Sequence, residues 1–133
     1  MITGVDHVVI AVKDMEAAIK QFESIYSQPV GERGEPAGAG FTNAFFRFGG
    51  GSFVELVSPT SDQGPVGKRI ATGGEGVYLM ALAVDDMQAT LADLRGKGVR
   101  LIGDPGEGNP VKGQVFIHPS AAGGVLTQLV QKK

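Results

Sequence analysis

The stretch VDHVVIAVKDMEAAIKQF, residues 5–22, returns in altered form as VYLMALAVDDMQATLADL, residues 77–94. The offset from Val12 to Val84 is 72 residues. At the same offset lie five further matched pairs: Asp14 with Asp86, Met15 with Met87, Ala17 with Ala89, Ile19 with Leu91, and Phe22 with Leu94. A repeat of this length predicts a duplicated supersecondary unit.

Each copy combines a strand pattern with a helix pattern. In the first copy, Val8, Ile10 and Val12 alternate along a β-branched run that is typical of a strand. Asp14 is a suitable N-cap, and Pro29 marks the helix end. Between them, apolar residues recur at helical spacing and predict a face that packs on a sheet: Met15, Ala18, Ile19, Phe22 and Ile25.

The second copy repeats this order, with a strand near residues 77–84, an N-cap at Asp86 and a glycine stop at Gly96 or Gly98. Further strands are predicted after each helix, at 41–48 and 52–57 in the first half and at 99–102, 114–118 and 125–130 in the second. A segment rich in Gly, Pro and Ser joins the halves, with a helical turn predicted at 66–71.

The pattern predicts an α+β fold: one domain, residues 1–133, made of two tandem βαβββ modules related by a pseudo-two-fold axis. The first module spans 1–60, the linker 61–75 and the second module 76–133. One helix covers only one face of each small sheet, so we expect the other faces to form a cup. A concave face of this kind is the natural place for a small-molecule ligand.

Composition excludes several classes of function. The chain has 133 residues, of which 42% are hydrophobic and 20% charged, as in an ordinary globular domain. Its net charge of -2 and scattered basic residues argue against nucleic-acid binding. The absence of cysteine excludes disulfides, thiolate nucleophiles and Cys-type zinc sites. No apolar run approaches the ~20 residues of a membrane span, and no basic leader precedes the first apolar run, so we expect a cytoplasmic protein that binds no membrane.

Five segments carry a resemblance to a known family: DHV from Asp6, ELVSP from Glu55, GVYLMAL from Gly76, GVRLI from Gly98 and HPSAAGGVL from His118. Together they resemble the vicinal oxygen chelate superfamily, which includes glyoxalase I, bleomycin-resistance proteins and extradiol dioxygenases. The resemblance is strongest to its methylmalonyl-CoA epimerase branch and covers nearly the whole chain.

The resemblance implies a divalent metal, Co, Mn, Ni or Zn, held by two side chains from each module. Carried over to this chain, the four positions are His7, Glu55, Leu79 and Gln128. The repeat supports the carry-over, because His7 and Leu79 are 72 residues apart and Glu55 and Gln128 are 73 apart. Leucine replaces one ligand, so the predicted metal ligands are His7, Glu55 and Gln128. Because the glutamine is neutral, this set predicts weak metal binding or none.

Two functions remain open at this stage. The first is an isomerase, epimerase or lyase that removes a proton next to the carbonyl of a small carbonyl or acyl-thioester substrate, with His7 and Glu55 as catalytic residues. The second is a metal-free protein that sequesters a small molecule, as resistance proteins of this superfamily do. A dioxygenase is disfavoured, because its iron needs two histidines and a carboxylate.

Each candidate residue also has a purely structural interpretation. A lone histidine such as His7 is more often a hydrogen-bonded structural residue, and Gln128 fits a polar position in the cup. Glu55 stands among apolar neighbours, where a carboxylate faces solvent or is buried with a partner, and His7 is the expected partner. The roles of Glu32 and Glu35, in GERGEP near the expected rim, stay open. The resemblance further predicts a homodimer, with modules paired within one chain or exchanged between two.

Overall fold

The computed structural model describes residues 1–132 and contains two βαβββ modules, which confirms the predicted α+β class. In chain order the elements are β1 (Ile2–Ala11), α1 (Met15–Tyr26), β2 (Arg33–Gly34), β3 (Phe41–Arg47), β4 (Phe53–Pro59), α2 (Pro65–Gly73), β5 (Gly76–Val84), α3 (Met87–Gly96), β6 (Leu101–Ile102), β7 (Val115–Ile117), the 3-10 helix η1 (Pro119–Ala121) and β8 (Thr127–Gln131).

The chain divides into two compact units. One consists of His7–Tyr78, and the other of Met1–Asp6 together with the residues from Leu79 onward. The first strand therefore begins in one unit and ends in the other. The predicted module boundaries, 1–60 and 76–133 with a linker between, describe the repeat rather than these units and stay a prediction.

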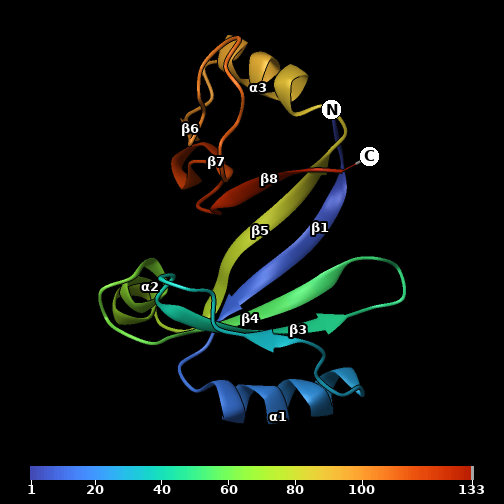
Figure 1. Ribbon diagram of the computed structural model, residues 1–133, viewed down its shortest axis with the longest axis vertical. Coiled ribbons are helices and arrows are strands. Elements are labelled where there is room, and N and C mark those ends of the chain that lie inside the picture. Colours follow the sequence, from blue (N-terminus) through green and yellow to red (C-terminus); the bar gives the residue numbers. More distant parts are fainter. Residues whose placement is uncertain (133) are drawn as a thin grey trace. The chain divides into compact units, whose positions relative to one another are not determined.

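The unit His7–Tyr78 contains four neighbouring strands in the order β2-β3-β4-β1. These four strands are called the first sheet below. β1 runs parallel to β4, and β3 is antiparallel to it. Helix α1 lies along one face of this sheet (Figure 1). Its apolar side chains and those of the strands form a buried core: Val12, Met15, Ala18, Ile19, Ala44, Phe46 and Leu56. The face turned away from α1 is called the open face below.

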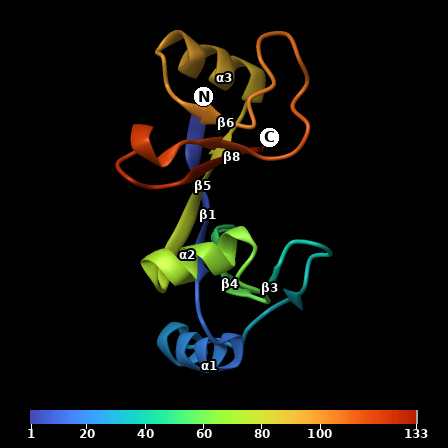
Figure 2. The same ribbon diagram turned by 90° about the vertical axis from the view of Figure 1, so that its left-hand side faces the viewer.

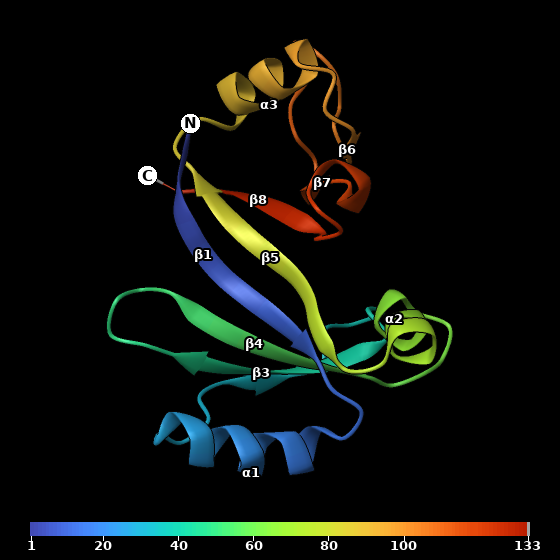
Figure 3. The ribbon, with the colours of Figure 1, turned by 180° about the vertical axis from the view of Figure 1, so that it is seen from behind.

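The other unit repeats the arrangement in the order β5-β8-β7-β6, called here the second sheet. β5 runs parallel to β8, and β7 is antiparallel to it. Helix α3 lies over this sheet (Figure 3), and the core between them contains Val84, Leu91, Val115, Ile117 and Leu129.

Strand register preserves the sequence repeat. Val9 pairs with Glu55 across β1 and β4, and Ala81 pairs with Gln128 across β5 and β8. Ala81 follows Val9 by 72 residues and Gln128 follows Glu55 by 73, and these are the two offsets found in the sequence. The two copies therefore place equivalent residues at equivalent points of their parallel strand pairs.

Helix α2 covers one end of the open face. Figure 2 shows α2 and α1 on opposite sides of β3 and β4, and Val66 of α2 is buried. A Cβ at Gly67 would lie 2.1 Å from the Ser61 carbonyl oxygen, so only glycine fits this close approach. The predicted helical turn at 66–71 is thus the centre of a longer helix, which begins with Pro65 at its first turn.

Three local expectations need correction. Ile25 is 61% exposed, and Tyr26 takes its place by packing on Phe22 and Phe46, because position 26 lies closer to the stripe set by the preceding turn. The helix ends at Tyr26, with Ser27 in the left-handed conformation, before it reaches Pro29. The third strand that the βαβββ pattern requires in the first module is β2, which was not located in the sequence because two residues carry too little pattern.

In the described part of the chain, no helix is both long and apolar enough to cross a membrane.

Both long helices begin with an aspartate cap, and its removal gives a testable prediction. The Asp14 carboxylate accepts a hydrogen bond from the Ala17 amide at 3.1 Å, and Asp86 accepts one from the Ala89 amide at 3.0 Å. We expect Asp14→Ala or Asp86→Ala to lower the free energy of unfolding by about 1 kcal/mol, measured by urea denaturation. Asp14→Asn retains an acceptor and should cost far less. An equal loss in Asp14→Asn and Asp14→Ala would contradict the capping role.

Candidate functional site

The open face collects polar and aromatic side chains because strands alternate their faces. Val54 and Leu56 of β4 pack toward α1, so Phe53 and Glu55 point to the other side. The register aligns Arg47, Phe53 and His7 across β3, β4 and β1. Sequence positions 47, 53 and 7 thus meet in one row, although they come from three separate strands.

Phe53 joins the members of this row. Its ring stacks on the His7 imidazole, with centroids 4.3 Å apart and planes tilted by 11°. The guanidinium carbon of Arg47 lies 4.8 Å from the centroid of the Phe53 ring and 5.1 Å from that of Phe45. Stacking restricts the rotation of the imidazole and presents its edge, rather than its face, to an approaching ligand.

Glu55 lies in the next row of the open face and is half-buried. Burial raises the pKa of Glu55, an effect that is partly offset by the Asn43 amide and by charge on His7 and Arg47. The Asn43 Nδ2 group donates to Glu55 Oε2 at 3.3 Å. His7 and Glu55 are diagonal neighbours on parallel strands, as the pairing of His7 with Phe53 shows. The structure therefore brings together the two residues that the sequence predicted as a pair.

Arg47 connects this face to Glu32. Its Nε donates to the Glu32 carboxylate at 2.7 Å, and both side chains are more than half exposed. Hydrogen bonds from its own backbone and from Arg47 lower the pKa of Glu32. Glu32 is thus the partner of a cation beside the candidate site, whereas Glu35 is an exposed residue of the following loop.

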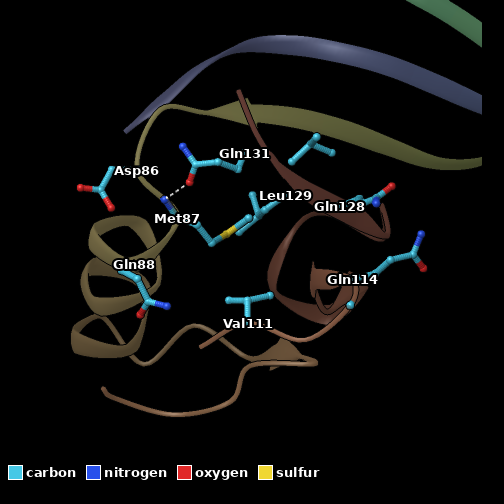
Figure 4. Close-up of a pocket in the computed structure, with 10 residues that line it drawn as sticks. Asp86, Met87, Gln88, Val111, Gln114, Gln128, Leu129 and Gln131 are labelled. Carbon is cyan, nitrogen blue, oxygen red and sulfur yellow. Dashed lines mark hydrogen bonds between the residues drawn. The ribbon is translucent and has the colours of Figure 1, made fainter. Parts of the chain in front are cut away.

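Leu79 and Gln128, the other two predicted ligand positions, lie in the unit that contains β5 and β8. Leu79 is 7% exposed and offers only hydrocarbon. Gln128 lines a cavity of about 480 Å³ between the start of α3, β8 and the loop before β7. Figure 4 shows Gln128 and Gln114 at one side of this cavity and Asp86 and Gln88 at the other. The Gln131 side chain closes one edge by accepting from the Met87 amide at 2.7 Å.

The donor set does not fit a divalent metal of the kind that the resemblance implies. Among residues 1–132, no three His, Asp or Glu side chains are grouped so that they could hold a metal ion. On the open face the donors are His7 and Glu55, one imidazole and one carboxyl. An alkyl group at 79 and a neutral amide at 128 add little affinity. We therefore derive no chemical step through a metal.

Sequence reasoning missed Asn43, Phe53 and Arg47 as members of this site. The period-two alternation around Glu55 places Phe53 on its face, and that signal was available. The contribution of β3 could not be found in the sequence, because the pairing of Phe45 with Glu55 depends on the register between two strands.

Comparison with known proteins defines the class of the chain. The family model of the Glyoxalase/Bleomycin resistance protein/Dioxygenase superfamily matches residues 6–116. The chain belongs to this family, which confirms the vicinal oxygen chelate fold expected from its sequence.

Its relatives within the family include methylmalonyl-CoA epimerases. The mitochondrial enzyme of Bos taurus is 29% identical over 133 residues, covering 95% of this chain and 73% of the relative. The ethylmalonyl-CoA/methylmalonyl-CoA epimerase of Cereibacter sphaeroides is 29% identical, covering 98% and 99%. A Streptomyces coelicolor methylmalonyl-CoA epimerase variant, solved with 2-nitronate-propionyl-CoA, superposes with a TM-score of 0.80 at 33% identity and covers 99% of both chains.

Glu55→Gln should stabilise the protein at neutral pH. Because the folded pKa of Glu55 is raised, wild-type stability is lost as the pH rises through that value, whereas a glutamine has no proton to lose. We expect the variant to exceed the wild type in free energy of unfolding at pH 7, and the difference to vanish below the ordinary carboxyl pKa of about 4.3. Urea titrations between pH 4 and 8, with the exposed Glu35→Gln as control, measure this. A variant less stable than the wild type at pH 7 would contradict it.

Metal titration tests the donor set directly. We expect protein purified without a histidine tag to show no stoichiometric site for Co²⁺, Mn²⁺, Ni²⁺ or Zn²⁺, and His7→Ala to change nothing, since the set lacks two strong ligands. Calorimetry and metal analysis provide the measurement. Stoichiometric binding that disappears in His7→Ala would show that His7 is a metal ligand.

Proposed function

We propose that this protein acts on a small carbonyl or acyl-thioester substrate, in the manner of methylmalonyl-CoA epimerases, by moving a proton next to the carbonyl. The observation that carries the proposal is the half-buried Glu55, whose pKa is raised, beside the stacked imidazole of His7. Its relatives act on methylmalonyl-CoA, and one of them also on ethylmalonyl-CoA, according to their names. The reaction class is an isomerase or a lyase.

Glu55 is suited to proton transfer because burial raises the pKa of its carboxyl group. A general acid or base works best when its pKa approaches the operating pH, and burial moves a carboxyl in that direction. Asn43 orients the carboxyl group by donating to Oε2. In this mechanism Glu55 takes the proton from the carbon next to the carbonyl.

His7 completes the pair. Its ring is held against Phe53, so the imidazole stays in one plane beside Glu55. An imidazole N–H is a hydrogen-bond donor. It is therefore able to donate toward the carbonyl oxygen, where negative charge develops as the carbon loses its proton. Return of the proton by Glu55 to the same face restores the substrate, and epimerisation follows when the enolate turns its opposite face to Glu55 before the proton returns.

We further propose that the protein is a homodimer, by analogy with its family, and that it is cytoplasmic, which its similarity to the epimerase of Cereibacter sphaeroides supports.

A metal-free binding protein is the second candidate, and the aromatic surface favours it. The rings of His7, Phe53 and Phe45 follow one another across the open face, and the Arg47 guanidinium lies over two of them. Such a surface stacks planar apolar ligands without any proton transfer. Saturable ligand binding with no turnover would favour this candidate.

Hydrogen exchange distinguishes the two functions. Methylmalonyl-CoA and ethylmalonyl-CoA are incubated with the protein in deuterium oxide, and deuterium at the carbon between the two carbonyl groups is followed by NMR. We expect the wild type to accelerate exchange, and Glu55→Gln and His7→Ala each to slow it by about 10²–10⁴-fold, the usual contribution of a general acid or base.

Glu107→Gln is the matched control, because it removes an exposed carboxylate outside the unit that holds His7 and Glu55. Exchange that is unaffected in both Glu55→Gln and His7→Ala would remove these residues from the mechanism. No acceleration by the wild type with either substrate would leave the binding protein as the better hypothesis.

A further inference from the structure

Arg47 lies at the end of the open face away from α2, and its side chain is 53% exposed. It belongs to the row that contains Phe53 and His7, and α2 covers the other end, near the end of β4 (Figures 1 and 2). The guanidinium lies within van der Waals range of two rings, 4.8 Å and 5.1 Å from their centroids. The rings fix the plane of the cation while its N–H edge remains accessible to water.

The partner of this cation is weakly held. Glu32 accepts from Nε at 2.7 Å, but its side chain is 58% exposed and that of Arg47 is 53% exposed. Exposed ion pairs contribute little to stability, because water solvates both charges. Glu32 is thus a replaceable ligand, and its carboxylate shows which chemical group this position accepts.

The distance to His7 determines which part of a substrate reaches Arg47. The two residues stand on strands separated by one other strand, a spacing of roughly 10 Å. A carboxylate attached to the reacting carbon lies a few bonds from the proton that moves. The phosphates of coenzyme A lie at the far end of the long pantetheine arm. Geometry therefore favours the carboxylate of the acyl group over the phosphates.

We propose that Arg47 is a specificity-determining residue that binds the carboxylate of a dicarboxylic acyl thioester, and that Glu32 occupies the same guanidinium when the substrate is absent. The inference rests on the proposed function for the thioester part of the ligand. A planar guanidinium with a fork of N–H donors matches a carboxylate. Glu32 competes with the substrate carboxylate for Arg47. Arg47 therefore strengthens substrate binding, and Glu32 weakens it.

Binding of three thioesters to the chain of 133 residues, measured by calorimetry, tests the assignment without turnover. Methylmalonyl-pantetheine carries the carboxylate alone, propionyl-CoA the phosphates alone, and propionyl-pantetheine neither. We expect Arg47→Met to weaken methylmalonyl-pantetheine by about tenfold or more, as the loss of a charge-assisted hydrogen bond does. The other two probes should change by less than about twofold. Glu32→Gln should strengthen methylmalonyl-pantetheine several-fold.

The Arg33 and Glu16 ion pair is the matched control. It is also an exposed Arg–Glu pair, and it joins β2 to α1 rather than lying over the aromatic rings. Arg33→Met and Glu16→Gln should leave all three affinities unchanged. If the Arg47 pair were merely structural, Arg47→Met and Glu32→Gln would change binding in the same direction, and that result would overturn the proposal.

Two other results would also overturn it. An equal loss of propionyl-CoA binding in Arg47→Met would assign Arg47 to the phosphates, and a wild type that binds none of the probes would refute the ligand class. Carboxylate-selective binding that depends on Arg47, in a protein that catalyses no hydrogen exchange, would instead support the assignment and refute proton transfer. The two proposals therefore fail separately.

Discussion

Parallel pairing of β1 with β4 is the constraint on which the candidate site depends. Parallel neighbours cannot be joined by a tight turn, so the chain between them must cross over the sheet. Here the connection contains α1, which packs its apolar residues on one face. The other face is left to His7, Phe53 and Glu55, which the register brings into adjacent rows. The same constraint acts on β5 and β8, with α3 in the connection.

The open face of the first sheet keeps a carboxyl where burial opposes its charge. The neutral form of Glu55 is favoured by burial, and its charged form by Asn43, His7 and Arg47. Opposing effects of this kind gather at functional sites, where a group must both hold and release a proton. Half-burial of a carboxyl on this face opposes its ionisation, whereas an apolar side chain would meet no such cost, so the glutamate at position 55 supports a role in chemistry or binding.

The two copies differ in chemistry although their geometry is equivalent. Val9 pairs with Glu55, and Ala81 pairs with Gln128 in the same way. The first copy presents an imidazole and a carboxyl, while the second presents an alkyl group and an amide at the matching positions. The proton transfer proposed above therefore concerns the first copy alone, and the second copy lacks the donors that the family resemblance implies for a metal.

Sequence alone determined the duplicated modules, the two aspartate caps and the equivalence of His7 with Leu79, because strand alternation, helical spacing and capping are local and repeat along the chain. It also selected His7 and Glu55 through resemblance to the family. Only the tertiary structure decided that Phe53 stacks on His7, that Asn43 donates to Glu55, and that Arg47 lies over the aromatic rings. Those contacts depend on the register between β3, β4 and β1, and no single strand encodes the register of its neighbours.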